Sequence, residues 1–125
     1  MRIRISKVAI AGLLCLPILA QAGGPVCAER KDLSGACFKV SGTLRLYNGA
    51  PSARIQIRGT KRLLGVVPYF LGNNETFAAP EGVRNRASFD QGLSGSFSVC
   101  PLSKPKPKEM QSVCIEAAKL ADTAK

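Results

Sequence analysis

The chain has 125 residues, with 18 lysine and arginine residues against eight acidic ones, and so a net charge of +10. It contains five cysteines and no histidine, which excludes histidine-based catalytic triads and histidine metal sites. This length suffices for a single domain, and the positive charge favours anionic partners without indicating a fold.

The N-terminal segment has the pattern of an export signal. Three basic residues, Arg2, Arg4 and Lys7, precede an uncharged apolar run from Val8 to Ala20, and Ala20-Gln21-Ala22 follows. Basic, apolar and small-x-small segments in this order are typical of a cleaved secretory signal. The apolar run is too short for a membrane span, which needs about 20 residues. A buried N-terminal helix is the alternative interpretation.

We therefore expect a signal-peptide helix over residues 1–22, removed after Ala22, and one domain over residues 23–125. No second apolar run of membrane length follows, so the mature form should have no transmembrane segment. Loss of three basic residues leaves 15 against eight acidic ones, a net charge of +7. The sequence thus predicts a periplasmic or secreted product.

Four cysteines remain after cleavage: Cys27, Cys37, Cys100 and Cys114. An even number of cysteines in an exported chain indicates two disulfides, although four cysteines permit three pairings. Zinc is disfavoured because there is no C-x-x-C pair. Cys100 and Cys114 lie on the polar faces of two strands that should form a hairpin, so we expect a bridge between them. Cys27 would then pair with Cys37.

The first half of the domain predicts three strands. Apolar and polar residues alternate strictly over Phe38–Tyr47, where Gly42 interrupts the apolar face and suggests a bulge. Asn48-Gly49 is typical of a tight reversal. Strands over Ala53–Arg58 and Leu63–Val67 would complete an antiparallel meander.

Residues 68–94 are harder to interpret. Structureless loops of this length are uncommon in compact domains, which indicates an element that the pattern does not resolve. Val83–Phe89 fits either a short strand or one helical turn. We expect Phe70, Phe77 and Phe89 to dock onto the core.

The last part predicts a second hairpin, with strands over Ser96–Cys100 and Gln111–Glu116. Alternating lysine and proline over Lys104–Lys108 favours an extended, exposed connection. Residues 117–125 could form one or two helical turns. The fold class expected is all-β, a small antiparallel β-sandwich or curled sheet with two disulfides, preceded by the signal-peptide helix.

The stretch FKVSGTLRLYNGAPSARIQIRGTKRLLGV, Phe38–Val66, resembles small exported proteobacterial proteins of unknown function. The shared pattern is F-x-V-x-G-x-L-x-x-Y-N-G-x-P-x-x-R-I followed by G-T-x-R-x-L-G-V, and GSFSVCPL and MQSVCIEA are similar to the same family's second half. The resemblance implies no activity. The V-x-G-x-L strand is also loosely similar to transthyretin-like and carboxypeptidase-regulatory β-sandwiches, which favours an all-β fold alone.

No catalytic constellation stands out in the sequence. No pair of carboxylates is placed for acid–base work, there is no tryptophan to line a sugar site, and phosphate-loop and dinucleotide glycine patterns are missing. We expect no cofactor and no metal, and a non-enzymatic protein is favoured without the question being decided.

The most suggestive feature is a set of basic residues on one predicted sheet face and its adjoining turn. Antiparallel pairing should bring their side chains near one another. The set is Arg45, Arg54, Arg58, Lys61 and Arg62. Such a patch could bind phosphate groups of an anionic envelope component, whereas the simplest alternative is a solvated basic face.

The leading hypothesis is therefore a non-enzymatic binding or interaction module of the envelope or the secreted fraction. The alternative is a small secreted hydrolase or an enzyme inhibitor that acts through residues 68–94. A pocket in which Glu81 and Asp90 converge would favour the enzyme.

Overall fold

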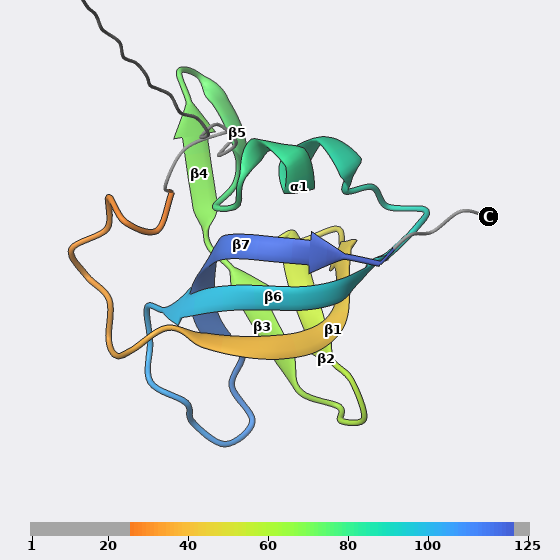
Figure 1. Ribbon diagram of the computed structural model, residues 1–125. Coiled ribbons are helices and arrows are strands. Elements are labelled where there is room, and N and C mark those ends of the chain that lie inside the picture. The colour runs from red at the N-terminus through yellow and green to blue at the C-terminus, as the bar shows by residue number, and fades with distance from the viewer. Residues whose placement is uncertain (1–25, 122–125) are drawn as a thin grey trace, which may run out of the picture.

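The computed structural model of the chain describes residues 26–121 (Figure 1). The predicted signal peptide, its cleavage after Ala22 and the last four residues lie outside this range. The described elements are β1 (Phe38–Leu46), β2 (Ala53–Ile57), β3 (Leu63–Val66), β4 (Pro68–Leu71), β5 (Asn74–Phe77), α1 (Glu81–Arg86), β6 (Leu93–Pro101) and β7 (Gln111–Leu120).

Five of the strands close into a barrel in the order β1-β2-β3-β7-β6, with β6 pairing back onto β1. All neighbours are antiparallel except β3 and β7, which run parallel. The expected all-β class with two disulfides is confirmed, and of the two expected shapes the curled sheet is found, closed on itself. Closure leaves no unpaired edge in the main sheet.

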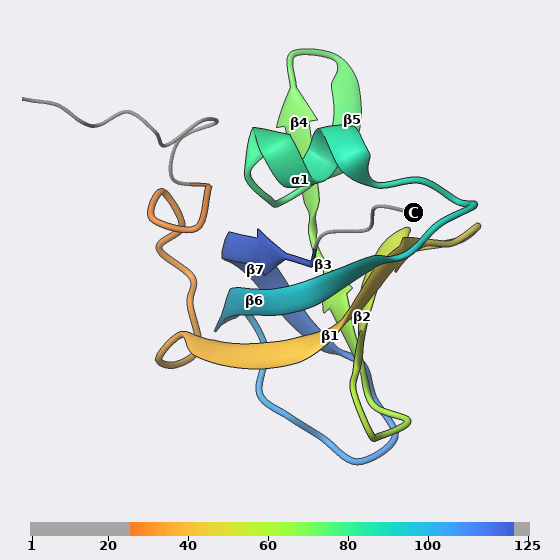
Figure 2. The same ribbon diagram turned by 45° about the vertical axis from the view of Figure 1, so that its right-hand side comes forward.

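The remaining elements lie across one end of the barrel. After β3 the chain forms the β4–β5 hairpin and α1, and then re-enters the barrel as β6. Both views place the hairpin and α1 at one end, and the β2–β3 turn and β6–β7 loop at the other (Figures 1 and 2). A five-stranded Greek-key barrel of this kind resembles the OB fold, which by itself implies no ligand.

The barrel interior is filled by the apolar residues that alternation along the strands predicted. Each barrel strand contributes at least one fully buried side chain, and the largest are Phe97, Leu44, Ile55, Leu64, Ile115, Val66, Val99 and Val113. Burial of one such side chain stabilises the fold by about 1.5–3 kcal/mol. The core therefore stabilises the barrel that carries the connecting loops.

The single register shift lies between β6 and β7, not at Gly42. Ser98 pairs with Ala117 but Val99 pairs with Ile115, so Glu116 is an extra, unpaired residue of β7. Such a bulge reverses which residues of β7 face the barrel interior on its two sides. The predicted bulge at Gly42 is wrong, because β1 pairs there in unbroken register with both β2 and β6.

Residues 68–94 contain the unresolved element that their length indicated: a hairpin, β4–β5, and the helical turn α1. Of the three phenylalanines expected in the core, Phe77 is buried, but Phe70 and Phe89 are 62% and 60% exposed. These two lie on the hairpin and the loop that project from the barrel, where no apolar surface covers them. The expected helical tail is also wrong up to Ala121, because β7 continues to Leu120.

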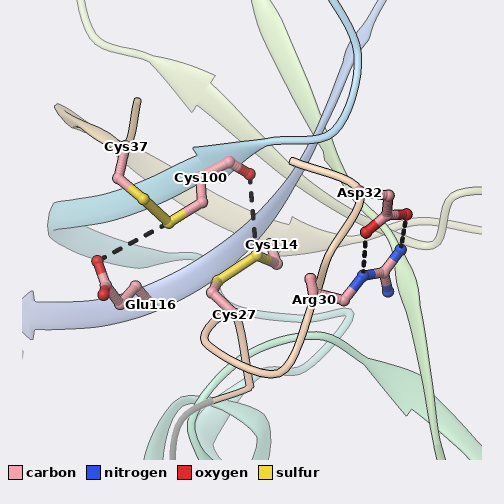
Figure 3. The surroundings of a disulfide bond; sticks show 7 residues. All are labelled: Cys27, Arg30, Asp32, Cys37, Cys100, Cys114 and Glu116. Atoms are coloured by element: carbon pink, nitrogen blue, oxygen red, sulfur yellow. Dashed lines mark hydrogen bonds and ion pairs between the residues drawn. A yellow bond between two sulfur atoms is a disulfide. The ribbon is translucent and has the colours of Figure 1, made fainter. Parts of the chain in front are cut away.

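The disulfides join Cys27 to Cys114 and Cys37 to Cys100, so the expected local pairing is wrong (Figure 3). Cys37 directly precedes Phe38, which pairs with Val99, and it therefore lies opposite Cys100 across β1 and β6. The expected pairing rested on β7 as the neighbour of β6, whereas β6 also pairs with β1.

A candidate anion-binding groove

The five basic residues singled out in the sequence occupy two ends of one barrel face. Arg45 and Arg54 are direct partners in the β1–β2 register. Arg58 follows β2, and Lys61 and Arg62 lie in the turn between β2 and β3. Arg54 and Arg58 are four positions apart, about 13 Å at the usual rise per residue of a strand. The structure therefore forms two basic groups.

Arg54 of the first group contacts the loop between β1 and β2. The guanidinium of Arg54 lies 4.5 Å from the centre of the Tyr47 ring, and its Nε donates a hydrogen bond to the carbonyl oxygen of Pro51 at 2.9 Å. The cation thus covers one face of the half-buried Tyr47 ring, which is then less free to stack on a nucleic-acid base. This geometry disfavours a nucleic-acid interface here.

Lys61 and Arg62 of the second group line a groove between the β2–β3 turn and the β6–β7 loop, whereas Arg58 is not among its lining residues. The groove has a volume of about 500 Å³, within the range of small-molecule sites. Its lining residues are Lys61, Arg62, Leu63, Lys106, Pro107, Lys108, Glu109 and Met110. Figures 1 and 2 show the two loops side by side at the barrel end away from α1.

The groove is cationic and its charge is not neutralised. Four basic residues line it against one acidic residue, Glu109. Within residues 26–121 the only ion pair joins Arg30 and Asp32, in the segment before β1, where hydrogen bonds from Arg30 lower the pKa of the Asp32 carboxyl. None of the groove's basic side chains is therefore ion-paired within the described chain.

A buried glutamine connects the two walls of the groove. Gln111, only 5% exposed, accepts a hydrogen bond from Arg62 and donates one to the carbonyl oxygen of Ser103 at 2.9 Å. The backbone amide of Ser112 also donates to the Ser103 hydroxyl oxygen at 2.9 Å. The turn that carries Arg62 is thus tied to the loop that carries Lys106 and Lys108.

The β6–β7 loop presents Lys108 from a strained position. The amide of Glu109 donates to the carbonyl oxygen of Lys106 at 3.2 Å, and Lys108 has a φ of 66°. A type II turn has proline favoured at its second position and a positive φ at its third, which is normally glycine. Pro107 and Lys108 occupy these two positions. Strained residues of this kind gather at functional sites.

Sequence reasoning missed Lys106 and Lys108 as site residues. It treated Lys104–Lys108 as an extended linker, and the lysine density was the only available signal. The turn could not be recognised from the sequence, because its third position, where a type II turn normally has glycine, is Lys108.

The carboxylates of the alternative enzyme hypothesis line neither of the two hollows described. Glu81 and Asp90 are exposed on α1 and the following loop. The second hollow, about 90 Å³, lies beside the β1–β2 loop and includes Glu75 as its only acidic lining residue.

Two sets of potential metal ligands occur in the described residues, Cys27/Cys100/Cys114 and Cys37/Cys100/Glu116. Every cysteine in them is bonded in a disulfide, whereas a metal requires thiolates. We therefore interpret these residues as a cluster around two disulfides and not as a metal site.

No helix among residues 26–121 is long and apolar enough to cross a membrane. Comparisons with protein-family models, with curated proteins and with solved structures found no match to this chain. Its function must therefore be argued from its own residues.

Proposed function

We propose that the chain is an exported, non-enzymatic binding module that holds a phosphate-bearing component of the cell envelope in the groove between the β2–β3 turn and the β6–β7 loop. One observation carries the proposal: four basic side chains that have no ion-pair partner among residues 26–121 line a single groove. Charges of one sign in a concave site attract anionic ligands and concentrate them there.

Export is part of this proposal and rests on two features. The N-terminal pattern ending in Ala20-Gln21-Ala22 is typical of a signal peptide. Two disulfides persist in oxidising compartments such as the periplasm or the extracellular space. The resemblance to small exported proteobacterial proteins is in line with both, and we propose the same family relationship here.

The residue types in the groove suit phosphate in particular. Arg62 offers a planar fork of N–H donors that matches phosphate oxygens, and the lysines act as mobile point charges. Leu63, Pro107 and Met110 supply apolar wall for the carbon skeleton that carries the phosphates.

A non-enzymatic role follows from what lines the groove. Glu109 is its only carboxylate and stands among cations, so the groove offers no pair of groups for acid–base catalysis. The hydrolase or inhibitor alternative has no observation in its favour at residues 68–94.

A pair of charge-matched variants tests the proposal. Lys61→Ser/Lys106→Ser/Lys108→Ser removes three charges from the groove, whereas Lys31→Ser/Lys39→Ser/Lys119→Ser removes three exposed lysines elsewhere. Affinity for immobilised lipopolysaccharide should fall about tenfold or more in the groove variant, equivalent to about 1.4 kcal/mol. The control variant should bind nearly as the parent does.

Equal losses in the two variants would contradict the groove and leave only attraction by net charge. Dephosphorylated lipopolysaccharide and vesicles of anionic phospholipid distinguish the source of the phosphate. Binding of the parent should also weaken as salt rises to physiological strength, where exposed charges are screened beyond about 8 Å.

A further inference from the structure

The two disulfides lie next to each other on the barrel wall, at the β6–β7 pair. Cys100 of β6 and Cys114 of β7 are register partners, although each is bonded to a cysteine of the segment before β1. The sulfur atoms of Cys27, Cys100 and Cys114 all lie within 4.8 Å of one another. Figure 3 shows the two bridges side by side between the strands and that segment.

Only one of the four cysteines is open to solvent. Cys37 is exposed, whereas Cys27, Cys100 and Cys114 are exposed by no more than 1%. Thiol–disulfide exchange requires direct contact between a thiolate and a sulfur atom, so access decides which sulfur is attacked. An external thiol can therefore reach only Cys37.

We propose that this sulfur cluster is a thiol–disulfide exchange site that accepts two electrons from a dithiol attacking at Cys37 and ends with Cys27 and Cys37 as the two reduced thiols. A thiolate of the dithiol attacks Sγ of Cys37, breaks its bond to Cys100 and leaves Cys100 as a thiolate. That thiolate attacks Sγ of Cys114, forms a Cys100–Cys114 bond and expels Cys27, which takes a proton from solvent.

The dithiol's second thiolate then resolves the mixed disulfide. It attacks the dithiol's own sulfur, and Cys37 leaves and is protonated. The dithiol ends as a disulfide, oxidised by two electrons, and the protein ends with one disulfide and two thiols. Atoms and electrons balance without a further reactant.

The geometry favours the second step. Residues directly opposite in an antiparallel pair have Cα atoms about 4.5–5.5 Å apart, within the range that a disulfide spans. The carboxylate of Glu116 lies 3.8 Å from Sγ of Cys100 and repels a thiolate there. A lasting thiolate at Cys100 is thus disfavoured, and its attack on Cys114 removes the charge.

The exchange releases the whole segment before β1 in one event. Both new thiols, Cys27 and Cys37, belong to that segment, while the remaining bridge lies within the barrel. Val26 and Cys27 are buried against the core in the oxidised form. A two-electron reduction thus removes both covalent tethers, which two independent bridges would lose only through two separate reductions.

Limited reduction of the full mature protein tests the proposal. The protein is treated with one equivalent of dithiothreitol, alkylated and mapped without further reduction. Tryptic cleavage at Arg30 separates Cys27 from Cys37, and cleavage at Lys108 separates Cys100 from Cys114. We expect doubly labelled molecules to carry the label on Cys27 and Cys37 and to retain a Cys100–Cys114 bridge.

Label on Cys37 and Cys100 with an intact Cys27–Cys114 bridge would overturn the proposal, as would conversion straight to four labels. A second measurement needs no reductant. Cys37→Ser leaves three cysteines, and the single free thiol should be found on Cys27. A free thiol on Cys100 would contradict the exchange.

The matched control is Cys37→Ser/Cys100→Ser, which also lacks the exposed bridge but has no attacking thiol. It should keep the Cys27–Cys114 bond and show no free thiol. Release of Cys27 in this variant would overturn the assignment of Cys100 as the sulfur that attacks Cys114.

Discussion

Gly42 of β1 lies so close to Gln56 of β2 that no side chain fits between them. A Cβ atom at Gly42 would be 2.2 Å from the carbonyl oxygen of Gln56. Gly95, the register partner of Gly42 in β6, is in the same position toward β7, where a Cβ would be 2.3 Å from the carbonyl oxygen of Lys119. Two facing glycines on adjacent strands thus mark the line where the barrel wall closes on itself.

Gly42→Ala should destabilise the protein markedly. The methyl group meets backbone, which cannot rotate away, and overpacking of this kind costs about 1–3 kcal/mol. For a domain of this size that lowers the melting temperature by at least about 4–8 °C, measured by calorimetry. Gly82→Ala is the matched control: nothing lies within 4 Å of its Cβ, and alanine favours the helix α1. A Gly42→Ala protein as stable as the parent would contradict the close approach.

Arg62→Ala should cost stability as well as binding. It leaves the side-chain oxygen of buried Gln111 without its donor, and an unsatisfied buried acceptor costs about 1–3 kcal/mol. Lys61→Ala, next to it in the turn and exposed, should change stability by no more than about 0.5 kcal/mol. Urea denaturation of the two variants measures the difference, and equal midpoints would show that the Arg62–Gln111 contact is not needed.

Local patterns in the sequence were enough to find the five barrel strands and most of the core, but not β4, β5 or the exposure of Phe70 and Phe89. Alternation over Phe38–Tyr47 and the turn residues after it predicted β1, β2 and their antiparallel pairing, because these signals lie within a few residues. The reversal is not the tight Asn-Gly turn expected, since residues 47–52 form a longer loop in which only Gly49 has a positive φ. Closure of the barrel was not predictable in this way. It depends on β6 pairing with β1 and β7 lying parallel to β3, contacts between residues far apart in the chain.

The disulfides and the groove show the same limit. Cys100 and Cys114 are register partners in the predicted hairpin, but both are buried rather than on a polar face, and their bonding depends on where the segment with Cys27 and Cys37 returns to the barrel. The basic residues were found by type, yet the groove forms only where the β2–β3 turn meets a loop about 45 residues later. Long-range topology, not residue chemistry, was the missing information.

Export predicts a defined mature N-terminus. The signal pattern ending at Ala22 should direct cleavage before Gly23, since small residues precede the cut at the positions that signal peptidase reads. Intact-mass analysis of the periplasmic or secreted fraction should give a chain that begins at Gly23, with four cysteines in two disulfides. A protein that keeps Met1 and Cys15 would contradict cleavage.

The last prediction separates stability from binding at Lys108. Among the described residues it is the one non-glycine residue with a positive φ, which costs an L-residue about 1–2 kcal/mol. Lys108→Gly removes this strain, at an offsetting cost of about 0.5–1 kcal/mol from the more flexible unfolded chain. The variant should therefore melt at or above the temperature of the parent, although it has lost a groove cation.

Lys104→Gly is the control in the same loop, because it makes the same chemical change at an exposed residue that lacks a positive φ and does not line the groove. Lys104→Gly makes the unfolded chain more flexible but relieves no backbone strain in the folded state. It should therefore melt about 4–8 °C below Lys108→Gly. Lipopolysaccharide affinity should show the reverse order, with Lys108→Gly weakened and Lys104→Gly close to the parent. If Lys108→Gly melts lower than Lys104→Gly, the turn is not strained at Lys108. If the two bind equally, Lys108 is not a groove cation that the ligand contacts.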